Sequence, residues 1–139
     1  MVGTEIGAEN ERIISMGYVS NSRLRELYIA SDLFLFPSYS EGFSLAIVEG
    51  LSVGLPPIIR SINPATEVIK NGINGFIASH SEDFSRLLVE IENGIYPIEN
   101  IKLNAEQTSR EIEMGFRSEM EVLVSTLLES VISKKASKS

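Results

Sequence analysis

Two glutamates, Glu41 and Glu49, stand eight residues apart around the start of an apolar segment. A carboxylate accepts hydrogen bonds, so Glu49 could hold the paired hydroxyls of a ribose. Glu41 could do the same for a second sugar, or stabilise positive charge that develops at its anomeric carbon. Two glutamates at this spacing also occur by chance in acidic helices. A solvated helix face for Glu49 and a surface loop for Glu41 therefore stay open as alternatives.

The residues between the two glutamates predict a loop that leads into a helix. Gly42 lets the backbone turn without a side chain in the way. A helix that begins near Ser44 would direct the amides of Phe43, Ser44 and Leu45 outward, and a helix N-terminus carries about half a positive charge. Such a terminus is a natural seat for a diphosphate.

Glu49 would stand roughly 7–8 Å along this helix. Its neighbours Ile47, Val48 and Leu51 are apolar, which predicts a mostly buried helix. A carboxylate on such a helix needs polar partners, and the hydroxyls of a ribose would supply them.

Alternating strands and helices must position this loop. Four short apolar runs predict strands at Ile13–Gly17, Leu33–Phe36, Pro57–Arg60 and Phe76–Ala78. Helical patterns predict helices at residues 20–30, 45–53, 64–70, 82–91, 98–109 and 117–133. This alternation predicts an α/β fold, a Rossmann-like parallel sheet of about four strands with flanking helices. Because Leu33–Phe36 is continuously apolar, we expect this strand to be buried on both faces of the sheet.

Ligands of such sheets bind beyond the carboxyl ends of the strands, where loops lead into helices. That rule points to two loops, Tyr18–Ser20 and Ser38–Ser44. Arg60 ends another strand and could reach an anion, but we expect a structural or solvated role for it.

Composition sets outer limits on the function. The 139 residues fit one compact domain, which we expect over residues 1–133 with a disordered tail at 134–139. The net charge of −7 argues against a nucleic-acid partner. There is no Cys, and the single His80 is expected in a solvated loop, so we expect no metal site. No membrane span or secretion signal is visible, which is compatible with the cytoplasmic location that we expect.

Several segments resemble the retaining glycosyltransferases of family four, which have the GT-B fold. Pro37–Leu45 followed by Glu49 resembles the family's Glu-x7-Glu signature. Further segments that agree in order and spacing are Met16–Ser20 (third strand and base-contacting loop), Leu27–Asp32 (helix before the Phe-Pro-Ser strand), Gly54–Ile59 (Gly-x-Pro-Val-Ile turn and strand) and Asn71–Phe76 (Asn-Gly-Phe turn). The match covers residues 14–91 and implies a partial GT-B C-terminal, donor-binding domain.

The resemblance implies roles for the matching residues only. Glu41 would be the catalytic residue, in contact with the donor sugar nearest the reaction centre, and Glu49 would hold the ribose. Backbone groups for the diphosphate and sugar would come from the donor-binding residues Gly42, Phe43, Ser44 and Leu45. Tyr18 and Val19 would contact the nucleobase. The donor would be a nucleotide sugar such as a UDP- or GDP-sugar, with no required metal and no other cofactor.

The chain departs from the family's pattern at its beginning. The acceptor site of a full enzyme lies largely on an N-terminal domain, and we expect this chain to be truncated before it. The Arg and Lys that neutralise the donor diphosphate in the family come from an upstream strand and loop, and Arg12, Arg23 and Arg25 do not occupy that motif. Two strands of the family's sheet are also expected to be missing, so the chain could self-associate through an incomplete sheet.

Three hypotheses about function remain open. The first is the donor-binding segment of a retaining glycosyltransferase, inactive as an isolated chain and cytoplasmic, with peripheral membrane association of the full-length protein. The second is a catalytically silent Rossmann-like binding or interaction module, or a remnant that needs a partner chain. The third is a flavodoxin-like signalling domain, which would need an Asp at the end of a central strand, whereas Asp32 precedes its strand.

Overall fold

The computed structural model describes residues 13–39 and 44–136. Its elements are α1 (Asn21–Ala30), β1 (Phe34–Phe36), α2 (Leu45–Ser52), β2 (Pro57–Arg60), the 3-10 helix η1 (Pro64–Glu67), β3 (Phe76–Ala78), α3 (Ser81–Glu92) and α4 (Ile98–Ala136). The strands form one parallel sheet in the order β1-β2-β3. The predicted α/β fold with a parallel sheet and flanking helices is therefore confirmed.

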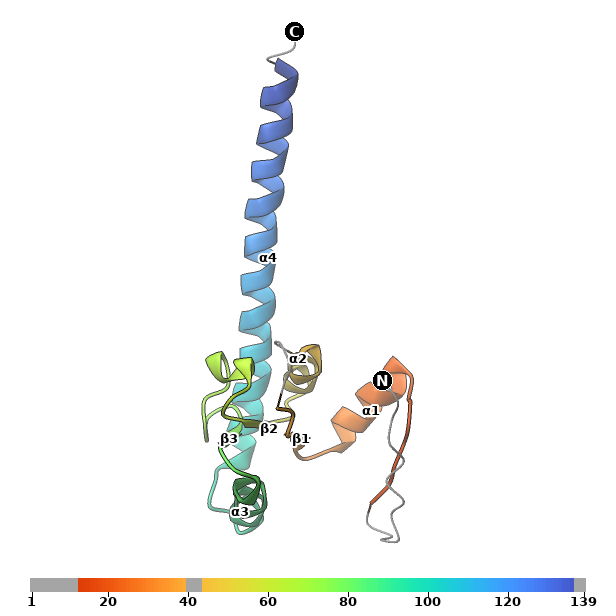
Figure 1. Ribbon diagram of the computed structural model, residues 1–139, viewed down its shortest axis with the longest axis vertical. Coiled ribbons are helices and arrows are strands. Elements are labelled where there is room, and N and C mark those ends of the chain that lie inside the picture. Colours follow the sequence, from red (N-terminus) through yellow and green to blue (C-terminus); the bar gives the residue numbers. More distant parts are fainter. Residues whose placement is uncertain (1–12, 40–43, 137–139) are drawn as a thin grey trace.

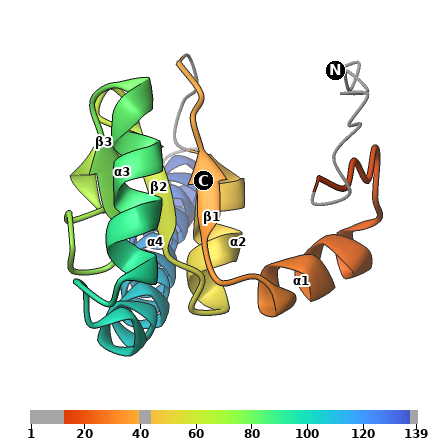
Figure 2. The ribbon, with the colours of Figure 1, turned by 90° about the horizontal axis from the view of Figure 1, so that it is seen from below.

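Helices lie on both faces of this sheet (Figures 1 and 2). One face packs against α2, η1 and the first half of α4, in a buried cluster of Ile47, Leu51, Ile59, Ala65, Ile69 and Ala105. The other face packs against α3 and the start of α4, in a buried cluster of Ile58, Phe76, Ala78, Leu87 and Ile101. Ile58 and Ile59 belong to different clusters because successive side chains of a strand point to opposite faces.

Two expectations for the strands are wrong. Residues 13–17 form no strand, and Ile13 and Ile14 are 55% and 78% exposed. A strand needs a hydrogen-bonding partner, and no strand in the described ranges pairs with the second edge of β1. β1 is thus an edge strand there, and Leu35 is 45% exposed instead of being covered. The described sheet has three strands, not about four.

Helix α1 lies to the side of β1 instead of covering a face of the sheet (Figure 2). Ser20 caps this helix, because its hydroxyl accepts a hydrogen bond from the backbone amide of Arg23 at 3.3 Å. No residue of α1 is buried. Tyr28 links the helix to the sheet, because its ring packs edge-on against Phe34 with 5.5 Å between the ring centroids.

Two glycines let α2 approach its neighbours closely. A Cβ atom at Gly50 would lie 3.4 Å from the Phe34 ring, so this face of α2 lies against β1. Gly54 has a φ of +71°, and a Cβ atom there would lie 3.2 Å from the Glu106 carboxylate of α4. The helix predicted at 45–53 ends at Ser52 with Val53 as its C-cap, and Gly54 follows at the contact with α4.

Helix α4 is one continuous helix of 39 residues, whereas the sequence predicted two helices at 98–109 and 117–133. Glycine costs about 1 kcal/mol relative to alanine inside a helix, which weakens a helix without ending it. Gly115 therefore lies inside the helix, where no neighbouring group would meet its missing side chain. Within the described ranges, no helix combines the length and the apolar character that crossing a membrane would require.

Candidate functional site

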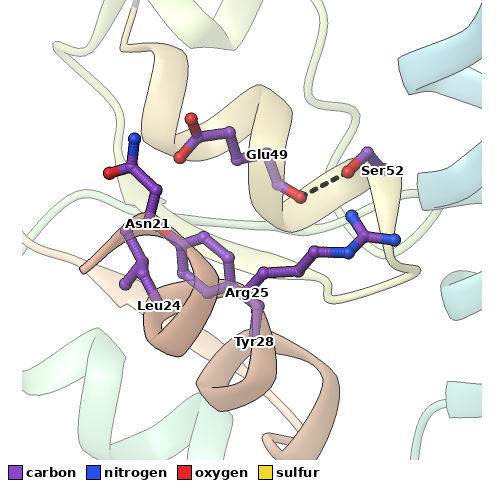
Figure 3. Close-up of a pocket in the computed structure, with 6 residues that line it drawn as sticks. All are labelled: Asn21, Leu24, Arg25, Tyr28, Glu49 and Ser52. Atoms are coloured by element: carbon purple, nitrogen blue, oxygen red, sulfur yellow. Dashed lines mark hydrogen bonds between the residues drawn. The ribbon is translucent and has the colours of Figure 1, made fainter. Parts of the chain in front are cut away.

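A pocket of about 190 Å³ lies between α1 and α2. We call it the α1–α2 pocket, and it is lined by Asn21, Leu24, Arg25, Tyr28, Glu49 and Ser52 (Figure 3). The first four residues come from α1 and the last two from α2, so the pocket exists because both helices lie beside β1. Glu49 is the one lining residue that the sequence predicted as part of a site.

Glu49 occupies the second turn of α2 and faces α1. Its side chain is exposed, although the helix that carries it is buried along its other side, as its apolar residues predicted. Ile47, Gly50 and Leu51 take the buried side of the helix and leave Glu49 on the side of the pocket, which agrees with the alternative of a solvated helix face. The backbone carbonyl of Glu49 accepts a hydrogen bond of 2.7 Å from the Ser52 hydroxyl, so the last turn of α2 is held at the pocket wall.

Tyr28 forms the opposite wall of the pocket. Burial raises the pKa of its hydroxyl above the ordinary value of 10.0, and the negative charge of Glu49 raises this pKa further. The Tyr28 hydroxyl therefore keeps its proton at neutral pH and can donate a hydrogen bond to an occupant of the pocket.

Arg25 gives the pocket a positive charge. Figure 3 shows its guanidinium near Ser52, at the C-terminal end of α2, while the Glu49 carboxylate reaches away from it. The two charged groups consequently border different ends of the pocket. Arg25 lies at the end farther from the start of α2, which is where the sequence placed the seat for a diphosphate.

The start of α2 lies one turn before Glu49. Ser44 is the N-cap, and its carbonyl accepts a hydrogen bond from the Ile47 amide at 3.1 Å. The first amides of a helix have no partner inside the helix, so those of Leu45 and Ala46 are the ones that a ligand at this end of α2 would meet. The Leu45 side chain is 75% exposed at this end. Glu49 lies about 6 Å further along the helix axis.

The remaining predicted site residues divide into two groups. Tyr18 and Val19 directly precede the Ser20 cap of α1, two or three residues before Asn21 of the pocket, and the Tyr18 side chain is 99% exposed. Neither residue lines the α1–α2 pocket, and the Tyr18 ring stands in solvent. Glu41, Gly42 and Phe43 lie outside the described residues, so their predicted roles stay predictions.

Five of the lining residues carry no functional signal in the sequence, which predicts only a helix at residues 20–30 for the four that belong to α1. That pattern reveals no pocket, because the pocket depends on how α1 is placed relative to α2.

Arg60 is the last residue of β2, and it is only 7% exposed. Its Nε donates to the Pro37 carbonyl at 2.8 Å, and a terminal nitrogen donates to the Ser81 hydroxyl at 3.2 Å. Its guanidinium also lies over the Tyr39 ring and near the Phe84 ring. These contacts support the structural role expected for Arg60, because they fix the chain that leaves β1 toward α2.

Within residues 13–39 and 44–136, no three His, Asp or Glu side chains come together as a possible set of metal ligands. The expectation that the site works without a required metal stays a prediction.

Comparison with known proteins identifies the family to which the chain belongs. The family profile described as "Glycosyl transferases group 1" matches residues 8–107. The chain is 34% identical to the alpha-galactosylglucosyldiacylglycerol synthase of Streptococcus pneumoniae over 101 residues, which is 73% of this chain and 26% of that protein. It is 35% identical to the O-antigen chain mannosyltransferase B of Escherichia coli over 78 residues, which is 56% of this chain and 20% of that protein. The chain thus spans about a quarter of the length of these relatives.

Two solved structures share the fold. HepE of Anabaena in complex with UDP-glucose superposes with a TM-score of 0.69 at 24% identity, over 84% of this chain and 33% of HepE. Sucrose-phosphate synthase of Thermosynechococcus elongatus superposes with a TM-score of 0.75 at 16% identity, over 87% of this chain and 31% of the synthase. At these identities the likeness is one of fold.

Proposed function

The chain belongs to the glycosyl transferases group 1 family, and from that premise we propose that it forms the nucleotide-sugar site of a retaining glycosyltransferase. The observation that carries this proposal is the position of Glu49. It faces the α1–α2 pocket one turn after the start of α2, so one ligand can meet both the carboxylate and the helix N-terminus. A nucleoside diphosphate has the two matching groups, a ribose diol and a diphosphate.

In this assignment, the ribose lies in the α1–α2 pocket. Glu49 accepts hydrogen bonds from the ribose hydroxyls, and the protonated Tyr28 hydroxyl donates from the opposite wall. The nucleobase extends toward the backbone of Tyr18 and Val19, which precede α1. UDP–glucose bound to HepE supports this choice of ligand class, since HepE has the same fold.

The diphosphate lies at the start of α2, against the amides around Ser44 and Leu45. Transfer of the sugar breaks its bond to the diphosphate, and negative charge develops on the departing phosphate oxygen. A helix N-terminus stabilises such charge where it develops, which favours the transition state. The transferred sugar is contacted by Glu41, Gly42 and Phe43 in this proposal. Glu41 is the catalytic residue, and no metal is required.

In this proposal the binding site for the acceptor lies outside this chain. The relatives are three to five times longer than the matched segment, so a further part of a longer protein would bind the acceptor. The alternative is a catalytically silent module that keeps the fold and binds a nucleotide without transferring a sugar.

Titration with UDP-glucose and GDP-mannose, followed by NMR, tests the donor site. The amides of Ser44, Leu45 and Glu49 should shift together on addition of the preferred donor. The Glu49→Gln variant should bind roughly tenfold or more weakly, because it loses a charged acceptor of hydrogen bonds. Glu92→Gln, at an exposed position of α3, is the matched control and should bind like the unaltered chain.

Two results would count against the proposal. If the amides stay unshifted at millimolar concentrations of both donors, the nucleotide-sugar site is disproved. If the Glu49 and Glu92 variants bind equally well, the ribose does not contact Glu49. Donor binding without sugar transfer, in a longer protein that carries an acceptor domain, would favour the silent module.

A further inference from the structure

The guanidinium of Arg60 links the carboxyl ends of all three strands of the sheet. Arg60 is itself the last residue of β2. Its Nε donates to the carbonyl of Pro37, which directly follows β1. A terminal nitrogen donates to the hydroxyl of Ser81, which begins α3 three residues after the end of β3. Ligands of parallel sheets bind at this edge, so Arg60 ties together the strand ends beside which we place the donor.

Two aromatic rings hold the same guanidinium. Its carbon lies 3.8 Å from the centroid of the Tyr39 ring and 5.6 Å from that of the Phe84 ring, which belongs to α3. The face of an aromatic ring attracts a cation at such distances. Within the described ranges, the stack on Arg60 is the one cation or ring contact of Tyr39. The position of the Tyr39 ring therefore depends on Arg60.

The positive charge of Arg60 has no acidic partner among the residues that the structure describes. The side chain is nevertheless almost completely buried, and neutral groups surround it: a carbonyl, a hydroxyl and two rings. Burying a charge without a countercharge costs free energy, and an apolar residue of similar volume often gives an equally stable fold. Departures of this kind are typical of residues that serve a functional site.

The chain that Arg60 holds leads directly to the start of α2. Pro37 follows β1, and Leu45 is the first residue of α2, where the proposed function places the diphosphate. Arg60 fixes the beginning of this connection twice, at the Pro37 carbonyl and at the Tyr39 ring. A binding segment that is held in place before the ligand arrives loses less conformational freedom on binding, which strengthens the complex.

We propose that Arg60 is a positioning residue of the donor site, which acts through Pro37 and Tyr39 to favour binding of the diphosphate. This inference rests on the proposed function, because it needs a donor whose diphosphate lies at the start of α2. Arg60 contacts none of the six residues that line the α1–α2 pocket. Its effect should consequently concern the diphosphate and spare the nucleoside.

Parallel NMR titrations of the full chain with UDP and with uridine test this inference. Uridine reports the α1–α2 pocket alone, whereas UDP adds the diphosphate. If GDP-mannose is the preferred donor, GDP and guanosine replace them. Tyr39→Ala removes the stacked ring from a position that is 68% exposed, so the fold should stay intact. This variant should bind UDP about tenfold more weakly and uridine unchanged.

Arg60→Lys should give the same pattern as Tyr39→Ala, because lysine keeps the charge but cannot reproduce the planar fork. Tyr39→Phe keeps the ring and should retain the affinity for UDP. Phe116→Ala, which removes a 66% exposed ring from α4, is the matched control for the loss of a ring. Gly94→Ala strains the backbone behind α3, so it controls for a loss of stability and should bind both ligands like the unaltered chain.

The possible results separate this inference from the proposed function. Normal binding of UDP by Arg60→Lys would show that a positive charge suffices and would overturn the positioning role. Normal binding of UDP by Tyr39→Ala, or an equal loss for UDP and uridine, would also overturn it. An unaltered chain that binds neither nucleotides nor nucleosides would instead disprove the proposed function, and the inference would fall with it.

Discussion

The guanidinium carbon of Arg60 lies 3.8 Å from the centroid of the Tyr39 ring. Arg60 ends β2, whereas Tyr39 belongs to the chain that leaves β1, so this contact joins two neighbouring strand ends. Together with the hydrogen bond from Arg60 to the Pro37 carbonyl, it fixes the start of the loop predicted at Ser38–Ser44. A residue far from Glu49 thereby helps to determine where that loop begins.

Replacement of Arg60 with alanine should destabilise the fold. The change removes two hydrogen bonds and the stacked guanidinium from a buried position, and we expect a loss of about 2–3 kcal/mol in the free energy of unfolding. Arg60→Lys should recover little of this loss, because an ammonium group cannot reproduce the planar fork. Urea unfolding at pH 7 measures the effect. Arg23→Ala, which removes only an exposed ion pair, should cost less than about 0.5 kcal/mol, and an equal loss in both variants would contradict our reading.

Removal of the charge on Glu49 should lower the pKa of Tyr28. A negative charge nearby disfavours the tyrosinate, so Glu49→Gln moves this pKa downward. Because burial is the larger cause, the pKa should stay above its ordinary value. Ultraviolet titration of the tyrosinate absorbance, with Tyr28→Phe to identify the signal, gives the measurement. An unchanged pKa would show that Glu49 does not face Tyr28.

The Asp83 carboxylate should make the free energy of unfolding depend on pH below about pH 4. Its pKa is lowered from 3.8 to about 2, chiefly by the hydrogen bond from Arg86, with further hydrogen bonds from the backbone amides of His80 and Ser79. A lowered pKa in the folded state means that the stabilisation is complete above the unfolded value and is lost as the pH falls from about 4 toward 2. Asp83→Asn should thus be less stable than the unaltered chain at pH 7, and this difference should shrink over that range. Urea unfolding at several pH values measures the difference. A constant difference would mean that the carboxylate charge is not involved.

An added side chain can destabilise the fold through backbone strain or through steric contact, and Gly54 and Gly94 distinguish these two causes. Both have a positive φ, +71° and +72°, but a Cβ atom at Gly94 meets nothing, whereas one at Gly54 lies 3.2 Å from the Glu106 carboxylate and 3.4 Å from the Lys102 carbonyl. Gly94→Ala should cost about 1–2 kcal/mol for the backbone conformation alone. Gly54→Ala should cost more, because α2 and α4 must move apart. Thermal or urea unfolding ranks the two, and a larger loss for Gly94→Ala would contradict the close packing of α2 on α4.

The sequence predicted most elements that depend on short-range pattern. The strand at Pro57–Arg60 and the helix at Leu45–Ser52 both rest on neighbouring residues and on local turn chemistry. The strand at 13–17 failed because an apolar run becomes a strand only beside a partner. The break predicted in α4 failed because one glycine weakens a helix without ending it.

The sequence by itself determined two things about the site: the resemblance to the family, and the choice of Glu41 and Glu49 as candidate site residues. Both follow from motif and spacing, which are properties of the chain. Only the tertiary structure decided that Glu49 is exposed, that it faces Tyr28, and that Arg25 borders the same pocket. Those facts depend on how α1 lies beside α2, and this placement is set by long-range packing through β1, Phe34 and α4. No local pattern records the relative position of two helices that are separated by a strand.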